Sequence, residues 1–509
     1  MKRRLLVIGL DCATPQLVFG SLRGKLPHLS RLMEEGVWGE LESTVPPITV
    51  PAWACMLSGR DPGELGIYGF RNRAGHGYEK LFIANAQSVT EKRIWDLLDE
   101  AERRSILVNI PQTYPVRPVN GKVVGCFLTP DKNAPFTWPA DLKKDLDAWC
   151  DGDYVIDVKD FRTTDKDGLL SRIITMTERR FRAVEKLMEE PWDFFMFVEM
   201  GVDRLHHGFW KFHDPSHPQY PGDSNPYRDV INAYYRRLDA HIGSVLRRAG
   251  EATDVLVVSD HGAKAMTGAF CINDWLMKTG RLRLKRQMET PGPLSPDMVD
   301  WKNTEAWGEG GYYGRIFLNV EGREPQGLIP RDKADAFRDE LAREIEALAF
   351  PDGTLMGNRV FFPENAYRSV RNVAPDLIAY FADLSVRAAG SVGNATFHRA
   401  ENDTGPDDAN HAQHGILILK TDPGTLAAAG LSPGQEIRGA SIYDVFPTLC
   451  SLCGLPFPAD MRGRPLLPGA GETRGAGLSA EAAGPAGQDA YSAEEEELVK
   501  KRLEDLGYI

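Results

Sequence analysis

The stretch LLVIGLD, residues 5–11, is an apolar run of the length of a buried strand, and it ends in an aspartate. Runs that are apolar throughout are typical of strands covered on both faces of a sheet. Five more follow along the chain: ILVNIP (106–111), FFMFVE (194–199), VLVVSD (255–260), DLIAYF (376–381) and GILIL (415–419). Because helical patterns separate these runs, we predict an α/β fold with a mostly parallel central sheet and helices on both faces.

The composition sets limits on the class of protein. The chain has 509 residues, enough for one large α/β domain with an elaboration or for two or three smaller domains. A net charge of -12, without a dense Lys/Arg stripe, argues against a role in coating nucleic acid. No apolar stretch approaches the length of a bilayer span, so we expect none. Seven scattered cysteines, an odd number, indicate reduced, buried thiols and a cytoplasmic protein.

Polar residues stand next to several of the predicted strands. In open parallel sheets the functional site lies beyond the carboxyl ends of the strands. The residues at these positions are carboxylates and imidazoles, which are ligands for divalent metals: Asp11, Asp203, His207, Asp260, His261, and the pair His411 and His414. Each alone could be a turn residue, a helix cap or a solvated side chain. Four such groups at four strand ends favour a metal site.

The stretch STVPPITVPAWACMLSG, residues 43–59, adds a hydroxyl to this set. Pro46 and Pro47 favour an extended approach, and Pro51 suits the first turn of a helix. Thr49 is therefore expected at or just before a helix N-terminus. Its hydroxyl could cap the helix, or it could act as a nucleophile toward an anion bound at that end.

In this combination the chain resembles the alkaline phosphatase superfamily, in its branch of type I phosphodiesterases and nucleotide pyrophosphatases. The matching pieces occur in the family's order: GLD (9–11), TVPAW (49–53), DRLHH (203–207), SDHG (259–262) and a late His before GILI (415–418). The closing segment YDVFPTLCSLCGLPFPADMRGRPL (443–466) also resembles the end of that fold. The resemblance spans nearly all of residues 1–467.

The resemblance implies two divalent metal ions, most often Zn²⁺ in relatives, with Mn²⁺ as the other candidate. One ion would be held by Asp11, Asp260 and His261, with the Thr49 hydroxyl as its fourth ligand. The other would be held by Asp203, His207 and a late His. The family's spacing favours His411 for that ligand, with His414 as the alternative. Thr49 would attack phosphorus and form a phosphothreonine intermediate.

The resemblance also implies the type of substrate. Relatives carry an Asn that binds a phosphoryl oxygen where this chain has Phe70, so Asn72 and Arg71, with Arg73 as a further alternative, are the candidates to replace it. We expect hydrolysis of phosphodiester or phosphoanhydride bonds in a small phosphoester or nucleotide-like substrate. The alternatives are a phosphomonoesterase or a phosphonate-type hydrolase or transferase on the same site, and a non-catalytic, metal-stabilised binding protein. The sequence leaves the oligomeric state open.

The domain organisation follows from these motifs and from composition. Residues 1–262 and 405–467 are expected to form the catalytic core, and 263–404 to be partly core with a cap insertion. Residues 468–490 are Gly/Ala-rich, as in a flexible linker. Residues 491–509 predict a helical tail that begins at Ser492. The tail could dock on the core, mediate association, or bind nothing.

Overall fold

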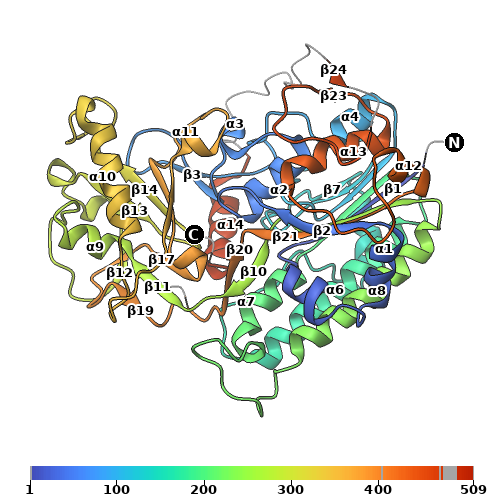
Figure 1. Ribbon diagram of the computed structural model, residues 1–509, viewed down its shortest axis with the longest axis horizontal. Helices are drawn as coiled ribbons and strands as arrows, with labels where there is room; N and C mark the ends of the chain where they lie inside the picture. Colours follow the sequence, from blue (N-terminus) through green and yellow to red (C-terminus); the bar gives the residue numbers. More distant parts are fainter. Residues whose placement is uncertain (1–2, 403–404, 469–471, 474–489, 508–509) are drawn as a thin grey trace.

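The computed structural model describes residues 3–402, 405–468, 472–473 and 490–507, and a nine-stranded sheet forms its centre (Figure 1). In spatial order the strands are β22 (Ala440–Ser441), β2 (Val37–Glu42), β21 (His414–Lys420), β9 (Asp254–Val258), β1 (Leu5–Leu10), β8 (Phe194–Glu199), β5 (Ser105–Val108), β6 (Gly121–Val124) and β7 (Thr137–Trp138). The run from β9 to β6 is parallel, while β21 and β7 are antiparallel to their neighbours. The predicted mostly parallel α/β fold is confirmed.

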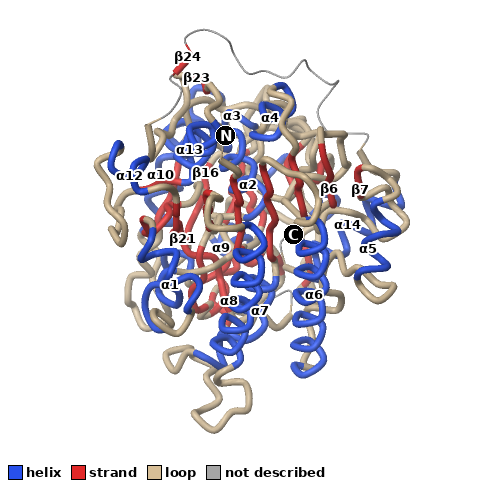
Figure 2. The backbone as a smooth tube through the Cα atoms, turned by 90° about the vertical axis from the view of Figure 1, so that its right-hand side faces the viewer, coloured by secondary structure: helices blue, strands red, loops and turns tan. Residues whose placement is uncertain are grey.

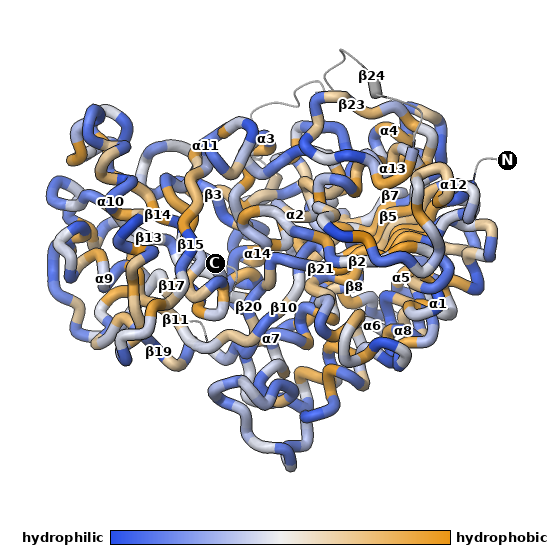
Figure 3. The backbone as a smooth tube through the Cα atoms, viewed as in Figure 1, coloured by the Kyte–Doolittle hydropathy of each residue, from blue (hydrophilic) through white to orange (hydrophobic). Residues whose placement is uncertain are grey.

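Helices cover both faces of this sheet, which explains why its inner strands are apolar along their whole length. In Figure 1 the helices below the sheet are α1 (Pro27–Glu35), α6 (Lys166–Leu187), α7 (Gly201–His213) and α8 (Val230–Ala249). Those above it are α2 (Thr49–Ser58), α4 (Ile94–Glu100) and α13 (Val445–Cys453). Every residue of β1, β8 and β9 is buried. Figure 2 shows strands in the middle of the molecule with helices around them, and Figure 3 shows apolar residues gathered where β5, β7 and β8 lie.

The strand register determines where the functional residues meet. Gly9 of β1 lies opposite Val198 of β8 on one side and Val258 of β9 on the other. Parallel strands that start in register also end at one edge. Asp11 therefore leaves the sheet level with the start of α7 and with Asp260, and its backbone N–H donates to Glu199 O at 3.1 Å.

The region 263–404 contains a second, smaller sheet with its own apolar core. Its strands, in spatial order, are β13 (Ala306–Glu309), β14 (Gly314–Leu318), β16 (Leu377–Tyr380) and β15 (Arg359–Phe361), and helices α9 (Ile272–Lys278) and α10 (Ala334–Glu346) accompany them. The run DLIAYF forms β16 and is antiparallel to both neighbours, so its assignment to the central sheet was wrong. A short strand buried on both faces has the same pattern in either kind of sheet.

Near the carboxyl end, the expected linker over 468–490 lies mostly outside the described residues. The predicted tail forms α14 (Ala493–Asp505), and the Ser492 side chain accepts a hydrogen bond from Glu495 N, as its expected role as N-cap requires. None of the described helices is long and apolar enough to cross a bilayer.

Gly9 is required by close packing in the middle of β1. A Cβ atom there would lie 2.6 Å from the Trp53 ring and 2.8 Å from Val198. We expect Gly9→Ala to lower the free energy of unfolding by about 1–3 kcal/mol, because the buried neighbours must move. Chemical denaturation would measure this. Gly75→Ala is the control, since its Cβ would meet no described atom within 4 Å; equal stability of the two variants would contradict the packing argument.

Candidate functional site

Six side chains from four parts of the chain converge at the edge of the central sheet. They are Asp11 after β1, Asp203 and His207 on α7, Asp260 and His261 after β9, and His411 on β20 (Ala409–Ala412). Each is exposed by 2% or less. Two sets of three have ligand-type atoms within 4.8 Å of one another, namely Asp11 with Asp260 and His261, and Asp203 with His261 and His411. The structure thus brings together the six protein side chains expected to bind metal.

The three imidazoles all turn the same nitrogen outward. Their Nδ1 atoms lie 3.1 Å from Gly262 O in His261, 2.8 Å from Pro47 O in His411, and 2.8 Å from Asp407 Oδ1 in His207. A carbonyl or carboxylate oxygen only accepts, so Nδ1 carries the hydrogen in each ring. In the neutral form of each ring the lone pair is then on Nε2, the arrangement found in metal-binding histidines.

The Nε2 atoms face carboxylate oxygens inside the site. His261 Nε2 lies 3.2 Å from Asp260 Oδ2 and 3.9 Å from Asp11 Oδ1. His207 Nε2 and His411 Nε2 lie 3.3 and 3.8 Å from Asp203 Oδ1. Burial lowers the pKa of His261 to about 4 and that of His411 well below its ordinary value, so both rings are neutral near pH 7.

The carboxylates of Asp11, Asp203 and Asp260 lie close together and none of them is exposed to solvent. Burial and the charge of Asp203 raise the pKa of Asp11 to about 8. Burial and the charge of Asp11 raise the pKa of Asp260 well above its usual range. Asp11 Oδ1 and Asp260 Oδ2 accept no hydrogen bond from any residue described. Unsatisfied buried carboxylates are costly, and a divalent cation would neutralise them, so this donor set fits a metal ion.

Asp203 differs because Arg204 pairs with its outer oxygen. The Arg204 guanidinium contacts Asp203 Oδ2 and is held from behind by Asp157 at 2.8 Å, which leaves Asp203 Oδ1 facing the imidazoles. Burial opposes ionisation of Asp203, but His207 and Arg204 outweigh it and its pKa falls well below the usual value. Burial likewise opposes the charged form of His207, yet Asp407 and Asp203 raise its pKa to about 9.

Thr49 is the first residue of α2 and Ile48 is the N-cap, so the threonine is not the capping residue, which was one of the two roles open to its hydroxyl. Its Oγ1 lies 3.3 Å from His261 Nε2, which directs the hydroxyl into the group of six. One turn later, Trp53 Nε1 donates to Asp11 Oδ2 at 2.7 Å. Helix α2 therefore places the Thr49 hydroxyl beside His261 and, through Trp53, orients the carboxylate of Asp11.

Other expected residues lie outside this group. His414 is exposed at the start of β21, opposite Glu42, whereas His411 points into the site. Asn72 is buried, accepts from Tyr68 N at 2.8 Å and donates to Gly69 O at 2.9 Å, so both amide groups hold a turn.

Arg71 is partly buried. Burial lowers the pKa of its guanidinium, and the negative charges of Glu309 and Glu504 offset part of this effect.

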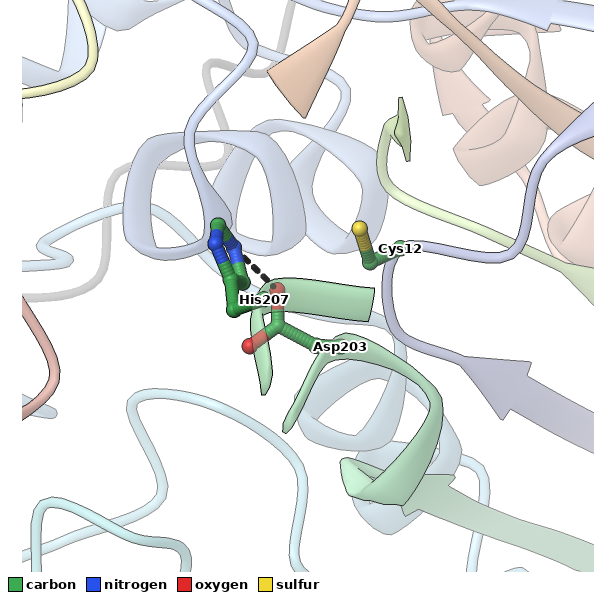
Figure 4. A group of neighbouring side chains, drawn as sticks. All are labelled: Cys12, Asp203 and His207. Atoms are coloured by element: carbon green, nitrogen blue, oxygen red, sulfur yellow. Dashed lines mark ion pairs between the residues drawn. The ribbon is translucent and has the colours of Figure 1, made fainter. Parts of the chain in front are cut away.

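The structure adds residues that the sequence analysis missed. Cys12 forms a third group with Asp203 and His207, with ligand-type atoms within 4.8 Å of one another (Figure 4). The backbone of Cys12 has a φ of 65°. From the sequence, its thiol is expected only to be one of several buried cysteines. Asp407 is the second missed residue, and its Oδ1 accepts a hydrogen bond from His207 Nδ1. The sequence could have indicated it as a carboxylate four residues before the candidate ligand His411.

The chain belongs to the type I phosphodiesterase/nucleotide pyrophosphatase family, whose model matches residues 5–416. It is a hydrolase of the alkaline phosphatase superfamily. No curated protein matches the chain.

Solved structures show the same fold at low sequence identity. Human ectonucleotide pyrophosphatase/phosphodiesterase 5 is 13% identical with a TM-score of 0.52, and the match covers 91% of this chain and 97% of that one. Phosphonoacetate hydrolase from Sinorhizobium meliloti, in complex with phosphonoformate, is 15% identical with a TM-score of 0.55, covering 87% of this chain and 94% of that one.

The pKa values lead to a pH dependence of metal binding. Without metal, Asp11 with a pKa of about 8 and His207 with a pKa of about 9 hold protons at pH 7. A metal ion must displace these protons, so we expect affinity to rise about tenfold per pH unit for each proton released, up to about pH 8 for the proton of Asp11 and about pH 9 for that of His207. Calorimetry in buffers of different ionisation enthalpy would count the protons. His207→Gln should release one fewer, and a pH-independent affinity would contradict the assignment.

Proposed function

We propose that the protein hydrolyses phosphodiester or phosphoanhydride bonds in a small, nucleotide-like substrate, with Thr49 as the nucleophile. The observation that carries this proposal is the position of the Thr49 hydroxyl, 3.3 Å from His261 Nε2, which belongs to a buried group of three carboxylates and three imidazoles. A lone threonine is a poor nucleophile, and such a group gives it the means of activation.

In this proposal Asp11, Asp260 and His261, with Thr49, would hold one divalent ion. Asp203, His207 and His411 would hold the other. Mixed imidazole and carboxylate ligands suit Zn²⁺, with Mn²⁺ as the second candidate. Two bound ions would lower the pKa of a hydroxyl or water and neutralise charge on the phosphoryl oxygens.

The chain's own residues account for the path of the phosphoryl group. The N-terminus of α2 presents backbone N–H groups that attract an anionic substrate beside Thr49. Thr49 Oγ1 forms a bond to phosphorus as the bond to the leaving oxygen breaks, and the hydroxyl proton passes by way of solvent to the leaving group. Water then attacks phosphorus as the bond to Oγ1 breaks; one of its protons passes to Oγ1, and the other goes to the phosphate product or to solvent. Arg71 remains a candidate to contact a phosphoryl oxygen through its fork of donors.

Thr49→Ala should remove this chemistry. We expect metal-dependent hydrolysis of bis-p-nitrophenyl phosphate to fall more than about a thousandfold, because the covalent step is lost. Thr49→Ser keeps a hydroxyl and is the matched control. Acid quenching followed by mass spectrometry should find phosphate on Thr49 in the wild-type protein. Undiminished metal-dependent turnover by Thr49→Ala would exclude the mechanism.

The same assay separates the alternative functions. Faster turnover of bis-p-nitrophenyl phosphate than of p-nitrophenyl phosphate supports the diesterase, and the reverse preference indicates a phosphomonoesterase. Phosphonoacetate belongs in the panel because a fold neighbour is a phosphonoacetate hydrolase. Tightly bound metal without turnover of any of these substrates indicates a hydrolase with a narrower substrate range.

A cytoplasmic location is part of the proposal. All seven cysteines are buried and free, which fits a reducing compartment.

A further inference from the structure

The C-terminal segment, defined here as residues 490–507, docks on the catalytic part of the chain. In the view of Figure 1, α14 lies between the central sheet and the strands β13 and β14. Its buried residues Val499, Leu503 and Leu506 follow a helical spacing and form one apolar face. Of the three roles that the sequence left open for the tail, the structure shows docking.

The contacts that anchor this segment lie in the loop after β6. Arg502 donates to the carbonyl oxygens of Phe127, Thr129 and Pro130. The Tyr491 hydroxyl donates to Leu128 O at 3.1 Å. All of these hydrogen bonds are to backbone carbonyls of residues 127–130, and they determine the position of the C-terminal end of α14.

The end of α14 meets a buried arginine. The last carbonyls of a helix have no partner inside it. Here Asp505 O accepts from Arg162 Nε at 3.2 Å, and Leu506 O accepts from Arg162 Nη2 at 3.0 Å. The same Nη2 pairs with Asp407 Oδ2 at 2.8 Å, and the side chains of Arg162 and Asp407 are 8% and 0% exposed. One guanidinium therefore joins the C-terminal segment to Asp407.

Tyr312 makes a second connection between the same partners. Its hydroxyl lies 3.2 Å from Leu506 O and 3.0 Å from Asp407 Oδ2. The other oxygen of Asp407 accepts from His207 Nδ1 at 2.8 Å. Through Tyr312 and Asp407, the carbonyl of Leu506 is thus three hydrogen bonds away from an imidazole of the candidate metal site.

Gly507 allows this close approach. It has φ of +77°, and a Cβ atom there would lie 1.6 Å from Arg162 Nη2. A larger residue would push Arg162 away or lift the end of the segment. The glycine therefore gives a way to disturb the junction without changing any residue of the group of six.

We propose that the C-terminal segment completes the outer shell of His207, so that its docking strengthens divalent metal binding by the group Asp203, His207 and His411. The inference rests on the proposed two-metal function. Arg162, Tyr312 and Asp407 act as positioning residues: the segment holds the first two on Asp407, and Asp407 fixes the ring of His207 with Nε2 facing inward. Outer partners of this kind typically change metal affinity about 10- to 100-fold.

The test measures metal binding directly, with Zn²⁺ alone as the probe in competition with a chelator. Gly507→Ala and a chain ending at Asp489 remove the junction. Asp407→Asn takes away the negative charge that faces His207 and Arg162, and Lys501→Ala on the exposed side of α14 is the control. We expect one of two bound ions to be held about 10- to 100-fold more weakly in the first three proteins. In the control we expect both ions to be held as tightly as in the wild-type protein. Hydrogen exchange of α14 in Gly507→Ala reports whether the segment remains docked.

The outcomes separate this inference from the function on which it rests. Two ions bound with unchanged affinity in the Gly507→Ala protein, with α14 exposed to exchange, would overturn the role of the segment while leaving the hydrolase mechanism intact. The same result in a folded chain ending at Asp489 would also overturn it. A wild-type protein that binds fewer than two ions and turns over no phosphoester contradicts the proposed function itself. Weakening of one ion in Gly507→Ala and Asp407→Asn alike supports the inference.

Discussion

The repulsion among three buried carboxylates is the constraint on which the site depends. The parallel register of β1, β8 and β9 brings Asp11, Asp203 and Asp260 to one edge of the sheet, where each is fully buried. Asp11 and Asp260 respond with raised pKa values, whereas Asp203 stays ionised beside Arg204 and His207. Such a group is expensive for a fold to keep unless positive charge compensates it, which is the physical argument for divalent cations here.

Around these carboxylates, the structure fixes orientation with partners from many parts of the chain. Each imidazole is held at Nδ1 by an oxygen acceptor, and Trp53 holds Asp11. Rings held in this way keep one tautomer and one direction, so little reorganisation is needed when a ligand arrives. Thr49 gains from the same rigidity, because it lies at the start of a buried helix.

The region 263–404 and the C-terminal segment contribute to the site through its outer partners. Tyr312 comes from the connection between β13 and β14, and Leu506 from the end of the chain. Tyr312 contacts Asp407, which orients His207, and Leu506 O bonds to Tyr312 and Arg162, which both contact Asp407. The orientation of His207 therefore depends on two segments that are far from it in sequence, the connection between β13 and β14 and the C-terminal segment. The region of the smaller sheet thus contributes to the site itself.

The sequence by itself determined the α/β class, the strand ends that carry Asp11 and Asp260, the helical spacing of Asp203 and His207, and the capped start of α14. These follow from local periodicity and from spacing within one element, which a linear pattern contains. Only the tertiary structure decided that DLIAYF joins a separate sheet, that His411 faces inward while His414 is exposed, and that Asp407, Cys12 and Arg162 surround the site. Those outcomes depend on contacts between residues that belong to different elements of the chain, and local patterns carry no information about which separate segments will meet.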